Sequence, residues 1–509
     1  MKNKIKRNIL VIVLQFLFVA GVYAQNTGIG TNLPKGKLHI KGSADTSQLV
    51  VDANNTQSNS SPLIRLRNAA GNDLLHIHSD DATNIFIGVS AGKLNNAAGG
   101  ALGNTFAEAQ AGSSNTTGFS LTGIGTYALL NNTTGGENTA IGPSALYSNT
   151  VGSYNTAIGR GALFQNNGSN NTATGFKSLF SNTSGSGNTA YGHRALLSNS
   201  AGFENTANGA SALSSNTTGS ANTANGYASL NDNTIGNYNT AIGYGALGSN
   251  ISGGENTANG VSALNSNTTG FSNTANGVNT LSFNTTGFFN TANGSNALNS
   301  NTTGASNTAI GLNALSLNTT GGDNIAIGIN SGNASGNLFN CIGIGNNGAF
   351  QNGVSNQAII GNSSTLFIGG KVNWGIVSDE RIKRNIKEDV KGLDFIMKLR
   401  PVTYNISNDA ISDVRKIKDT LNFAGKYNGE KITYTGFLAQ EVEQAAIATG
   451  YNFSGYTKPV TPDQLYTIRY AEFVVPLTKA VQEQQAIIES QQKQIELLEK
   501  RLAALEVKK

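Results

Sequence analysis

Polar and apolar residues recur through the middle of the chain with a period of 17 residues. The typical unit reads Asn-Thr-Ala-(Ile/Asn)-Gly-x-x-Ala-Leu-x-x-Asn-Thr-Thr-Gly-x-x. Units begin at Asn138, Asn155, Asn171, Asn188, Asn205, Asn222, Asn239, Asn256, Asn273, Asn290, Asn307 and Asn324, and one step, from Asn155 to Asn171, is 16. Degenerate copies extend the array over residues 84–370. A fixed period of this kind predicts stacked structural repeats.

The residues within one unit predict β-structure with a thin core. Two fixed glycines, several threonines and the Asn-Thr-Thr-Gly turn disfavour helix. Position nine is Leu in every full copy, after a small residue, which predicts a buried stack. The copies are Leu146, Leu163, Leu179, Leu196, Leu213, Leu230, Leu247, Leu264, Leu281, Leu298 and Leu315. Position twelve is Asn from Asn149 to Asn318, so we expect a ladder of side-chain hydrogen bonds.

Position four of the unit holds Ile in some copies, such as Ile141, and Asn in others, such as Asn259. A position that accepts both is not deep core, and we expect an exposed stripe or a face against a neighbouring subunit. The array resembles the β-roll heads of trimeric autotransporter adhesins, which repeat related Ala-Ile-Gly units. This resemblance implies a parallel β-solenoid. About fifteen coils spaced ~4.8 Å apart would form a rod on the order of 70 Å long.

Two further features flank or interrupt the array. His76 and His78 lie on one face of a predicted strand in a β-rich region, residues 25–83. In a three-fold fibre they would offer six nitrogens to a metal, but we favour two solvated strand histidines, and neither a metal nor a cofactor is expected. Cys341, the only cysteine, lies where the repeat usually has Thr, which predicts a half-buried thiol without a role.

The first residues predict export. Basic residues from Lys2 to Arg7 precede an apolar run and a small-residue cleavage site near Ala24, the layout of a secretory signal peptide over residues 1–24. No transmembrane segment is expected after its removal. Loss of its four cations reduces the net charge of +5 to 5 − 4 = +1. No nucleic-acid partner is therefore expected.

The last third of the chain has an ordinary composition, with 38 of the 63 charged residues from Asp379 onward. From Val474 the apolar pattern becomes heptad, which predicts a coiled coil over residues 474–509. Val474, Val481, Ile488, Ile495 and Leu502 take a positions, while Leu477, Gln484, Gln491, Leu498 and Leu505 take d positions.

Three runs in residues 371–473 point to a known domain: Ser378-Asp379-Glu380-Arg381-Ile382-Lys383, Leu399-Arg400-Pro401-Val402, and Gly436-Phe437-Leu438-Ala439-Gln440-Glu441-Val442. They resemble the C-terminal intramolecular chaperone of endosialidases and phage tail spikes (serine peptidase family seventy-four). The resemblance implies a small α+β domain that assembles a homotrimer, with three strands in the coiled coil. It also implies self-cleavage at Val377–Ser378, with Ser378 as nucleophile and Lys383 as base.

A lysine acts as a base only when neutral, and neighbouring cations and burial on assembly favour that form. Ser378 must lie in a loop or turn before a helix, because a spacing of five does not face two residues on one helix. The alternative is that Ser378 only caps a helix that starts at Asp379. Asp379 would orient Ser378 or bind Arg381.

Taken together, these patterns predict a mostly β, secreted homotrimeric fibre, with a β-solenoid shaft, a chaperone domain and a trimeric coiled coil. We expect the shaft to adhere to a glycan or cell surface. One alternative is a purely structural fibre with an uncleaved trimerisation domain. A polysaccharide hydrolase is disfavoured because the shaft's few acids, such as Glu137 and Glu204, lie in separate coils, whereas hydrolysis needs two carboxylates about 5–10 Å apart.

Overall fold

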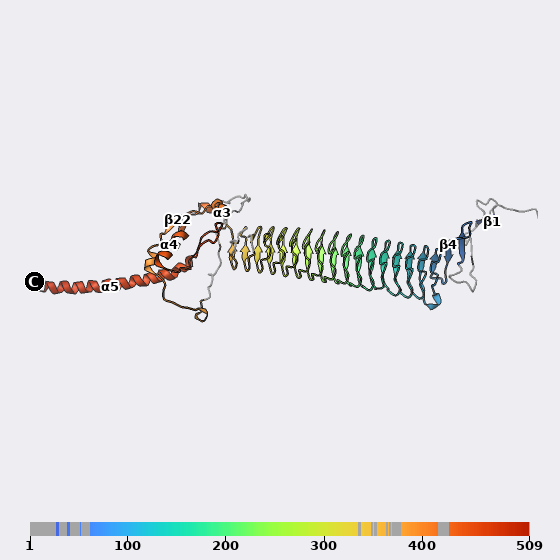
Figure 1. The fold of residues 1–509 in the computed structure, drawn as a ribbon, viewed down its shortest axis with the longest axis horizontal. Coiled ribbons are helices and arrows are strands. Elements are labelled where there is room, and N and C mark those ends of the chain that lie inside the picture. The colour runs from blue at the N-terminus through green and yellow to red at the C-terminus, as the bar shows by residue number, and fades with distance from the viewer. Residues whose placement is uncertain are drawn as a thin grey trace, which may run out of the picture.

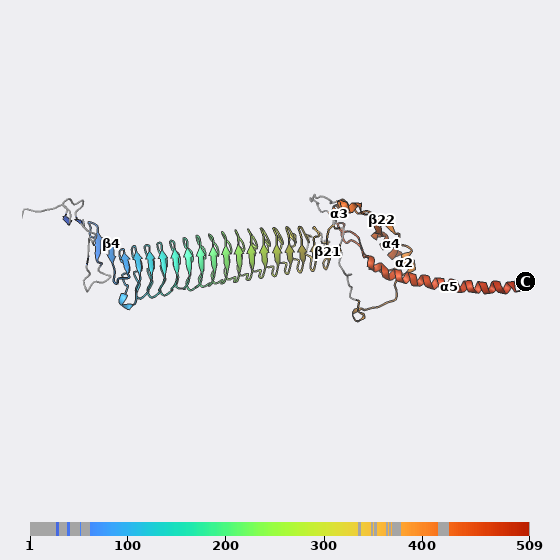
Figure 2. The same cartoon turned by 180° about the vertical axis from the view of Figure 1, so that it is seen from behind.

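The structure is a computed structural model. It describes residues 62–333, 337–347, 350, 354–362, 365, 368, 378–415 and 427–507, with residue 51 and two short strands, β1 (Thr27–Ile29) and β2 (Leu38–Ile40). The predicted signal peptide lies outside the described residues. A long rod is followed by a smaller α+β region and a single long helix, as both views show (Figure 1 and Figure 2).

The rod is a parallel β-solenoid of about 16 turns, as the repeat predicts. Each 17-residue unit supplies one three-residue strand, and each strand pairs in parallel register with the strand of the next unit. The strands are β5 (Ile85–Ile87), β6 (Thr105–Ala107), β7 (Thr122–Ile124), β8 (Thr139–Ile141), β9 (Thr156–Ile158), β10 (Thr172–Thr174), β11 (Thr189–Tyr191), β12 (Thr206–Asn208), β13 (Thr223–Asn225), β14 (Thr240–Ile242), β15 (Thr257–Asn259), β16 (Thr274–Asn276), β17 (Thr291–Asn293), β18 (Thr308–Ile310), β19 (Ile325–Ile327), β20 (Ile342–Ile344) and β21 (Ala358–Ile360). A short 3-10 turn, η1 (Ala97–Gly99), lies in the first coil, between β5 and β6.

The core of the solenoid is one column of small and medium apolar side chains. The Ala of position three, the small residue of position eight and the Leu of position nine are buried, for example Ala224, Ser229 and Leu230. Position four faces outward in the Ile copies and in the Asn copies alike, such as Ile141 and Asn259. The predicted core is therefore confirmed, and position four lies outside it, as the mixture of Ile and Asn predicts.

The first coils keep the core filled by exchanging large and small residues between positions. Phe86 and Phe106 take position three, and Gly92 and Gly112 take position nine. A Cβ on Gly112 would lie 2.4 Å from the Phe106 ring, so the ring occupies the space that Leu fills in other coils. Volume is thus conserved within a coil, which cores tolerate well.

Two asparagine ladders run through the interior of the solenoid. At position twelve, Asn233 donates from Nδ2 to Oδ1 of Asn216 at 2.8 Å, and this pattern confirms the predicted ladder. The second ladder, at position one, was not predicted. Its side chains accept from the backbone N–H of the next Asn and donate to a glycine carbonyl, as Asn222 does at 2.8 Å to Gly236. Both ladders satisfy backbone groups that the thin core would otherwise bury unpaired.

Cys341 corrects one expectation. The register pairs Ile342 with Ile325, so Cys341 stands at position one, where the repeat has Asn and not Thr. Its backbone N–H donates to Oδ1 of Asn324 at 3.0 Å, and its side chain is fully buried. The thiol therefore replaces the side chain of the Asn ladder near the end of the array.

At the N-terminal end, two antiparallel strands cover the first coil: β3 (Ile64–Arg67) and β4 (Asp73–His78). His76 and His78 do share one face of β4, but both are buried, so the expectation of solvated histidines is wrong. The His78 ring packs 5.1 Å from Phe86, because this strand face closes the open end of the hydrophobic column.

The C-terminal region is a small α+β unit. It contains α2 (Leu393–Ile396), β22 (Val402–Tyr404), α3 (Asn408–Arg415), η3 (Asn428–Lys431), β23 (Tyr434–Gly436), α4 (Ala439–Thr449), β24 (Tyr456–Thr457), β25 (Thr467–Ile468) and η4 (Tyr470–Phe473). Strands β22 and β23 are antiparallel, as are β24 and β25. Phe395, Val442, Phe453 and Phe473 form its core.

The chain ends in the long helix α5 (Val474–Glu506), which begins where the heptad pattern predicts. Its a and d side chains, such as Val481, Ile488 and Leu498, are exposed in the single chain. We call this line of exposed residues the heptad seam. Within the described residues, no helix is both long enough and apolar enough to cross a membrane.

Candidate processing site and assembly surfaces

The residues before α2 form a short turn that brings Ser378 and Lys383 together. Asp379 caps a 3-10 turn, η2 (Glu380–Ile382), by accepting from the backbone N–H of Arg381 at 2.8 Å. Lys383 follows the turn, and its N–H returns to the carbonyl of Glu380 at 3.1 Å. This single turn brings the side chains of Ser378 and Lys383 together, whereas a spacing of five on a continuous α-helix does not face two residues toward each other.

The Lys383 Nζ atom lies 2.8 Å from Ser378 Oγ. At this distance the protonated amine donates to the hydroxyl oxygen, and a neutral amine would accept the hydroxyl proton. This is the contact that a nucleophile and its base require. Both side chains are exposed in the single chain. Val377, the other residue of the predicted scissile bond, lies outside the described residues.

The roles of the neighbouring side chains are also defined. Asp379 binds Arg381 and supplies the helix cap, so Ser378 is not the cap of η2. The pKa of the Asp379 carboxyl is lowered, chiefly by the hydrogen bond from the Arg381 side chain. From the sequence, Arg384 was expected only as one of the cations near Lys383. Its Nη1 donates to the carbonyls of Arg381 and Lys383, at 2.7 and 2.9 Å, and so braces the turn from the other side.

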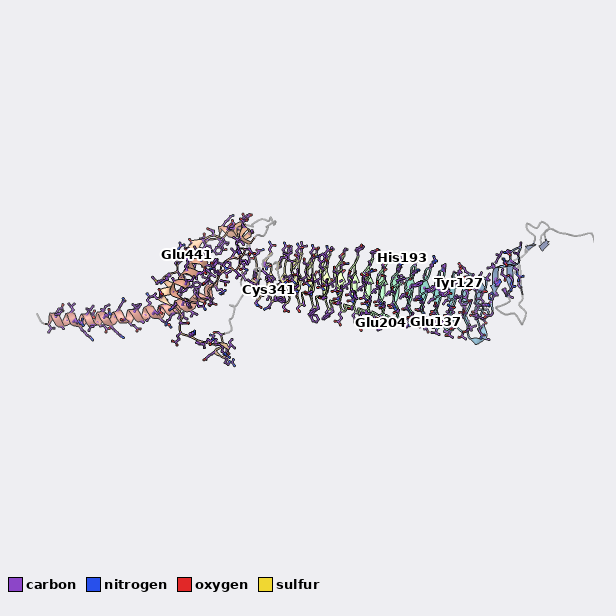
Figure 3. All side chains as sticks on the ribbon, in the orientation of Figure 1. Tyr127, Glu137, His193, Glu204, Cys341 and Glu441 are labelled. Carbon is purple, nitrogen blue, oxygen red and sulfur yellow. The ribbon has the colours of Figure 1, made fainter. Side chains whose placement is uncertain are left out.

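The remaining candidates do not form a second reactive centre. His76 lies beside Asp73, with 3.1 Å between Nε2 and Oδ2, while burial lowers the pKa of His78. Among the described residues, no group of three or more His, Cys, Asp or Glu side chains is placed to hold a metal ion. Glu137 and Glu204 lie apart along the rod, four coils from each other (Figure 3). At ~4.8 Å per coil they are ~19 Å apart, too far for a hydrolase pair.

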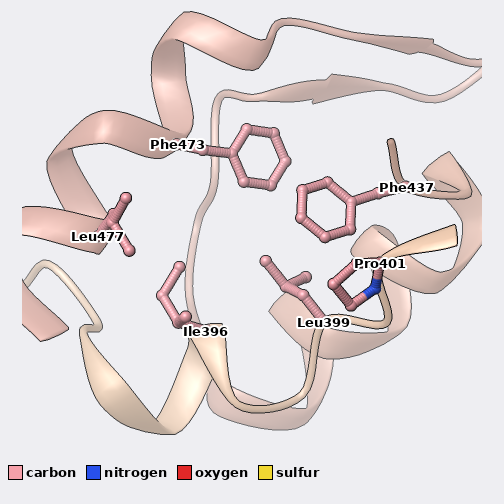
Figure 4. A pocket seen from close by; sticks show the side chains of 6 residues that line it. All are labelled: Ile396, Leu399, Pro401, Phe437, Phe473 and Leu477. Carbon is pink, nitrogen blue, oxygen red and sulfur yellow. The ribbon is translucent and has the colours of Figure 1, made fainter. Parts of the chain in front are cut away.

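An apolar pocket opens on the α+β unit where α5 begins. Its cavity has a volume of about 200 Å³ and is lined by six side chains that converge on one space (Figure 4): Ile396, Leu399, Pro401, Phe437, Phe473 and Leu477. Leu477 belongs both to the pocket and to the heptad seam, and about half of its surface is exposed. The pocket therefore continues the apolar surface of α5.

Ion pairs hold the outer face of the α+β unit. Arg400 binds Glu441, which links the end of the α2 segment to α4, and this bond lowers the pKa of Glu441. Glu443 of α4 accepts from Lys458 at 3.0 Å and from the Tyr466 hydroxyl at 2.8 Å. These two bonds lower the pKa of Glu443, with Lys458 as the larger cause.

Comparison with known proteins agrees with this geometry. The peptidase S74 family model, described as the chaperone of endosialidase, matches residues 378–451, from the Ser378 turn through α4. The match begins at the residue that would become the new N-terminus after cleavage. No curated protein matches the chain.

Proposed function

We propose that this chain, which carries a chaperone-of-endosialidase domain behind a long β-solenoid, is the subunit of a secreted homotrimeric surface fibre that processes itself. In this proposal the C-terminal domain and α5 assemble three chains, and the chain is then cut between Val377 and Ser378. The observation that carries the proposal is the 2.8 Å contact between Lys383 Nζ and Ser378 Oγ at the start of the matched domain.

The reaction balances as an acyl shift followed by hydrolysis. Neutral Lys383 takes the hydroxyl proton while Ser378 Oγ attacks the carbonyl carbon of Val377. The C–N bond to Ser378 then breaks, and its nitrogen takes the proton back from Lys383. The resulting ester is hydrolysed by water, which leaves a carboxylate on Val377 and restores the Ser378 hydroxyl. The new chain begins with a free amino group on Ser378.

Intact-mass measurement and N-terminal sequencing of the purified protein test this step. The wild type should yield a fragment that begins at Ser378, and Ser378→Ala and Lys383→Ala should each leave the chain whole while it remains trimeric by light scattering. Cleavage should slow at low pH, where the amine stays protonated. A wild-type chain that remains whole after assembly would reduce the domain to a permanent trimerisation clamp.

For the shaft we propose adhesion to a glycan or cell surface, supported by exposed aromatic rings. Tyr227 and Tyr244 stack at 5.4 Å in adjacent coils and are both more than half exposed. Phe271, Phe288 and Phe289 form a second exposed cluster. Apolar rings gathered on a surface in this way mark interaction sites.

Glycan-array or cell binding by the trimer tests adhesion. The pair of substitutions Tyr227→Ser and Tyr244→Ser should reduce binding if the first cluster is the contact, while Asn259→Ser serves as an exposed control. Absence of binding by the wild-type trimer would favour the alternative, a purely structural fibre.

A further inference from the structure

The segment before α2 carries apolar side chains that its own chain leaves uncovered. We call residues 378–391 the arm. Nearly all of the arm is exposed, including Ile382 at 62% and Ile386 at 69%. Ile382 ends the η2 turn and directly precedes Lys383. A short ordered turn therefore presents one isoleucine to solvent beside the proposed base.

The apolar pocket has the size and chemistry to receive such a side chain. Its volume is about 200 Å³, and all six residues that line it are apolar. A dry apolar cavity of about 150 Å³ is large enough to hold benzene, so the pocket has room for an isoleucine side chain. Because the turn is already ordered, little conformational entropy remains to be lost when it docks.

The position of the pocket favours an arm from another copy over the chain's own arm. Leu477 contributes to both the pocket and the heptad seam, so a second chain packed along α5 stands at the mouth of the pocket. Neighbouring packed helices lie about 8–10 Å apart. The arm is anchored on α5 where the Leu393 N–H donates to Glu483 at 2.7 Å. The eleven residue-to-residue steps from Leu393 to Ile382 span up to ~36 Å, which exceeds the separation of neighbouring packed helices.

We propose that Ile382 of each chain inserts into the pocket of a second copy, and that this exchange removes the Ser378–Lys383 pair from water. The inference rests on the proposed function and adds the contact that couples assembly to cleavage. Removal from water favours the neutral amine, which is the form that can act as a base. Ile382 is thus a positioning residue. Cleavage does not begin until Ile382 has docked in the pocket of a neighbouring chain.

Disulfide trapping in the full-length Ser378→Ala chain tests the docking without relying on proteolysis. Ile382→Cys combined with Leu399→Cys should give linked dimers and trimers on a denaturing gel after mild oxidation. Ile447→Cys with Leu399→Cys is the matched control, because Ile447 is 70% exposed on α4 and should give no links. Light scattering before oxidation separates the proposed trimer assembly from the proposed exchange of Ile382. A monomer would overturn trimer assembly and the exchange together, whereas a trimer with no links, or with only intrachain bonds, would overturn the exchange alone.

A second test starts from the chain before it is cut and measures the rate of cleavage as a function of pH. Ile382→Ser should slow cleavage about tenfold or more near neutral pH, yet the difference from the wild type should shrink as the pH is raised, because a base is then less dependent on burial for its neutral form. Ile382→Val, which keeps an apolar side chain, should cleave at the wild-type rate at neutral pH. Equal slowing at every pH would show that Ile382 only stabilises the fold and would overturn its positioning role.

Discussion

Leucine at position nine of the repeat adopts a backbone conformation that leucine disfavours. From Leu129 to Leu315 its φ lies between 49° and 53°, in the left-handed region. The cost is about 1–2 kcal/mol per residue, and full burial of the side chain contributes about 1.5–3 kcal/mol. Burial therefore outweighs the strain in each coil, and this balance explains why a large apolar residue is retained where glycine would fit the backbone better.

This balance predicts opposite outcomes at two residues of the shaft. Leu230 is fully buried, and Leu230→Asp should destabilise the local coils by a few kcal/mol because it buries an unpaired charge. Asn259 is exposed at position four, so Asn259→Ile should change stability by less than ~0.5 kcal/mol. Thermal unfolding of both variants measures the difference, and equal effects would contradict the assignment of core and exposed face.

Residue identity predicted the burial of some positions better than others. The unvarying Leu indicated the core, and the mixture of Ile and Asn indicated a position outside the core. The histidines of β4 were misread because alternation shows that two side chains share a face but not which face is covered. In the case of Cys341, the degenerate end of the array obscured the register, which only the pairing of Ile342 with Ile325 fixes.

At the scale of the element, side-chain amides join each coil to the next, alongside the buried apolar column. A three-residue strand makes few ladder bonds, and the loop of the coil leaves buried carbonyls. The two Asn columns supply the missing donors. The sequence predicted the column at position twelve, whereas the column at position one was taken only as the start of the unit. Its invariance was visible, but its inward direction depends on the path of the preceding turn.

Removal of one amide from a ladder should therefore destabilise several coils. Asn216 donates to Asn199 at 2.7 Å and to Gly219 at 2.8 Å, and it accepts from Asn233. Asn216→Ala loses all three bonds, at about 1 kcal/mol each, and we expect a loss of about 2–4 kcal/mol. Hydrogen exchange should show faster opening in the two adjoining coils, while the exposed Asn259→Ala should leave exchange unchanged.

The α+β unit should lose stability in acid through Glu443. Bonds from Lys458 and Tyr466 lower the pKa of Glu443 in the folded state. Its contribution is therefore fully present above the unfolded value of ~4.3 and is lost as the pH falls through the lower folded value. Glu443→Gln should lower Tm at pH 7 and flatten the decline of Tm below pH ~4.3. Glu388→Gln, in the exposed arm, is the control, and an unchanged pH profile in Glu443→Gln would contradict this role.

At the scale of the whole molecule, the repeat creates a problem of register. Near-identical units can pair correctly or slip by a whole unit at little difference in energy. Each coil pairs with the next coil along the chain, so an array that is stacked incompletely exposes unpaired strand edges that can aggregate. In the proposed trimer, α5 would join three chains at one defined point and so remove the slipped alternatives. Heptad spacing and family motifs predicted the order of shaft, α+β unit and long helix, but not the pocket, because its six residues come from segments far apart in sequence.

The last prediction concerns the heptad seam of α5. Ile488 is an a residue with half of its surface exposed in the single chain, so Ile488→Asp should place charges in the core of the proposed trimer and prevent assembly. Deletion of residues 481–509 should act more strongly and give aggregated or misassembled chains. Ser490→Asp, at a c position of the same helix, should leave the trimer intact. Light scattering and the yield of soluble protein measure assembly. A well-folded, soluble monomer from the deletion would show that the shaft finds its register alone, since no clamp would then be needed to exclude the slipped pairings.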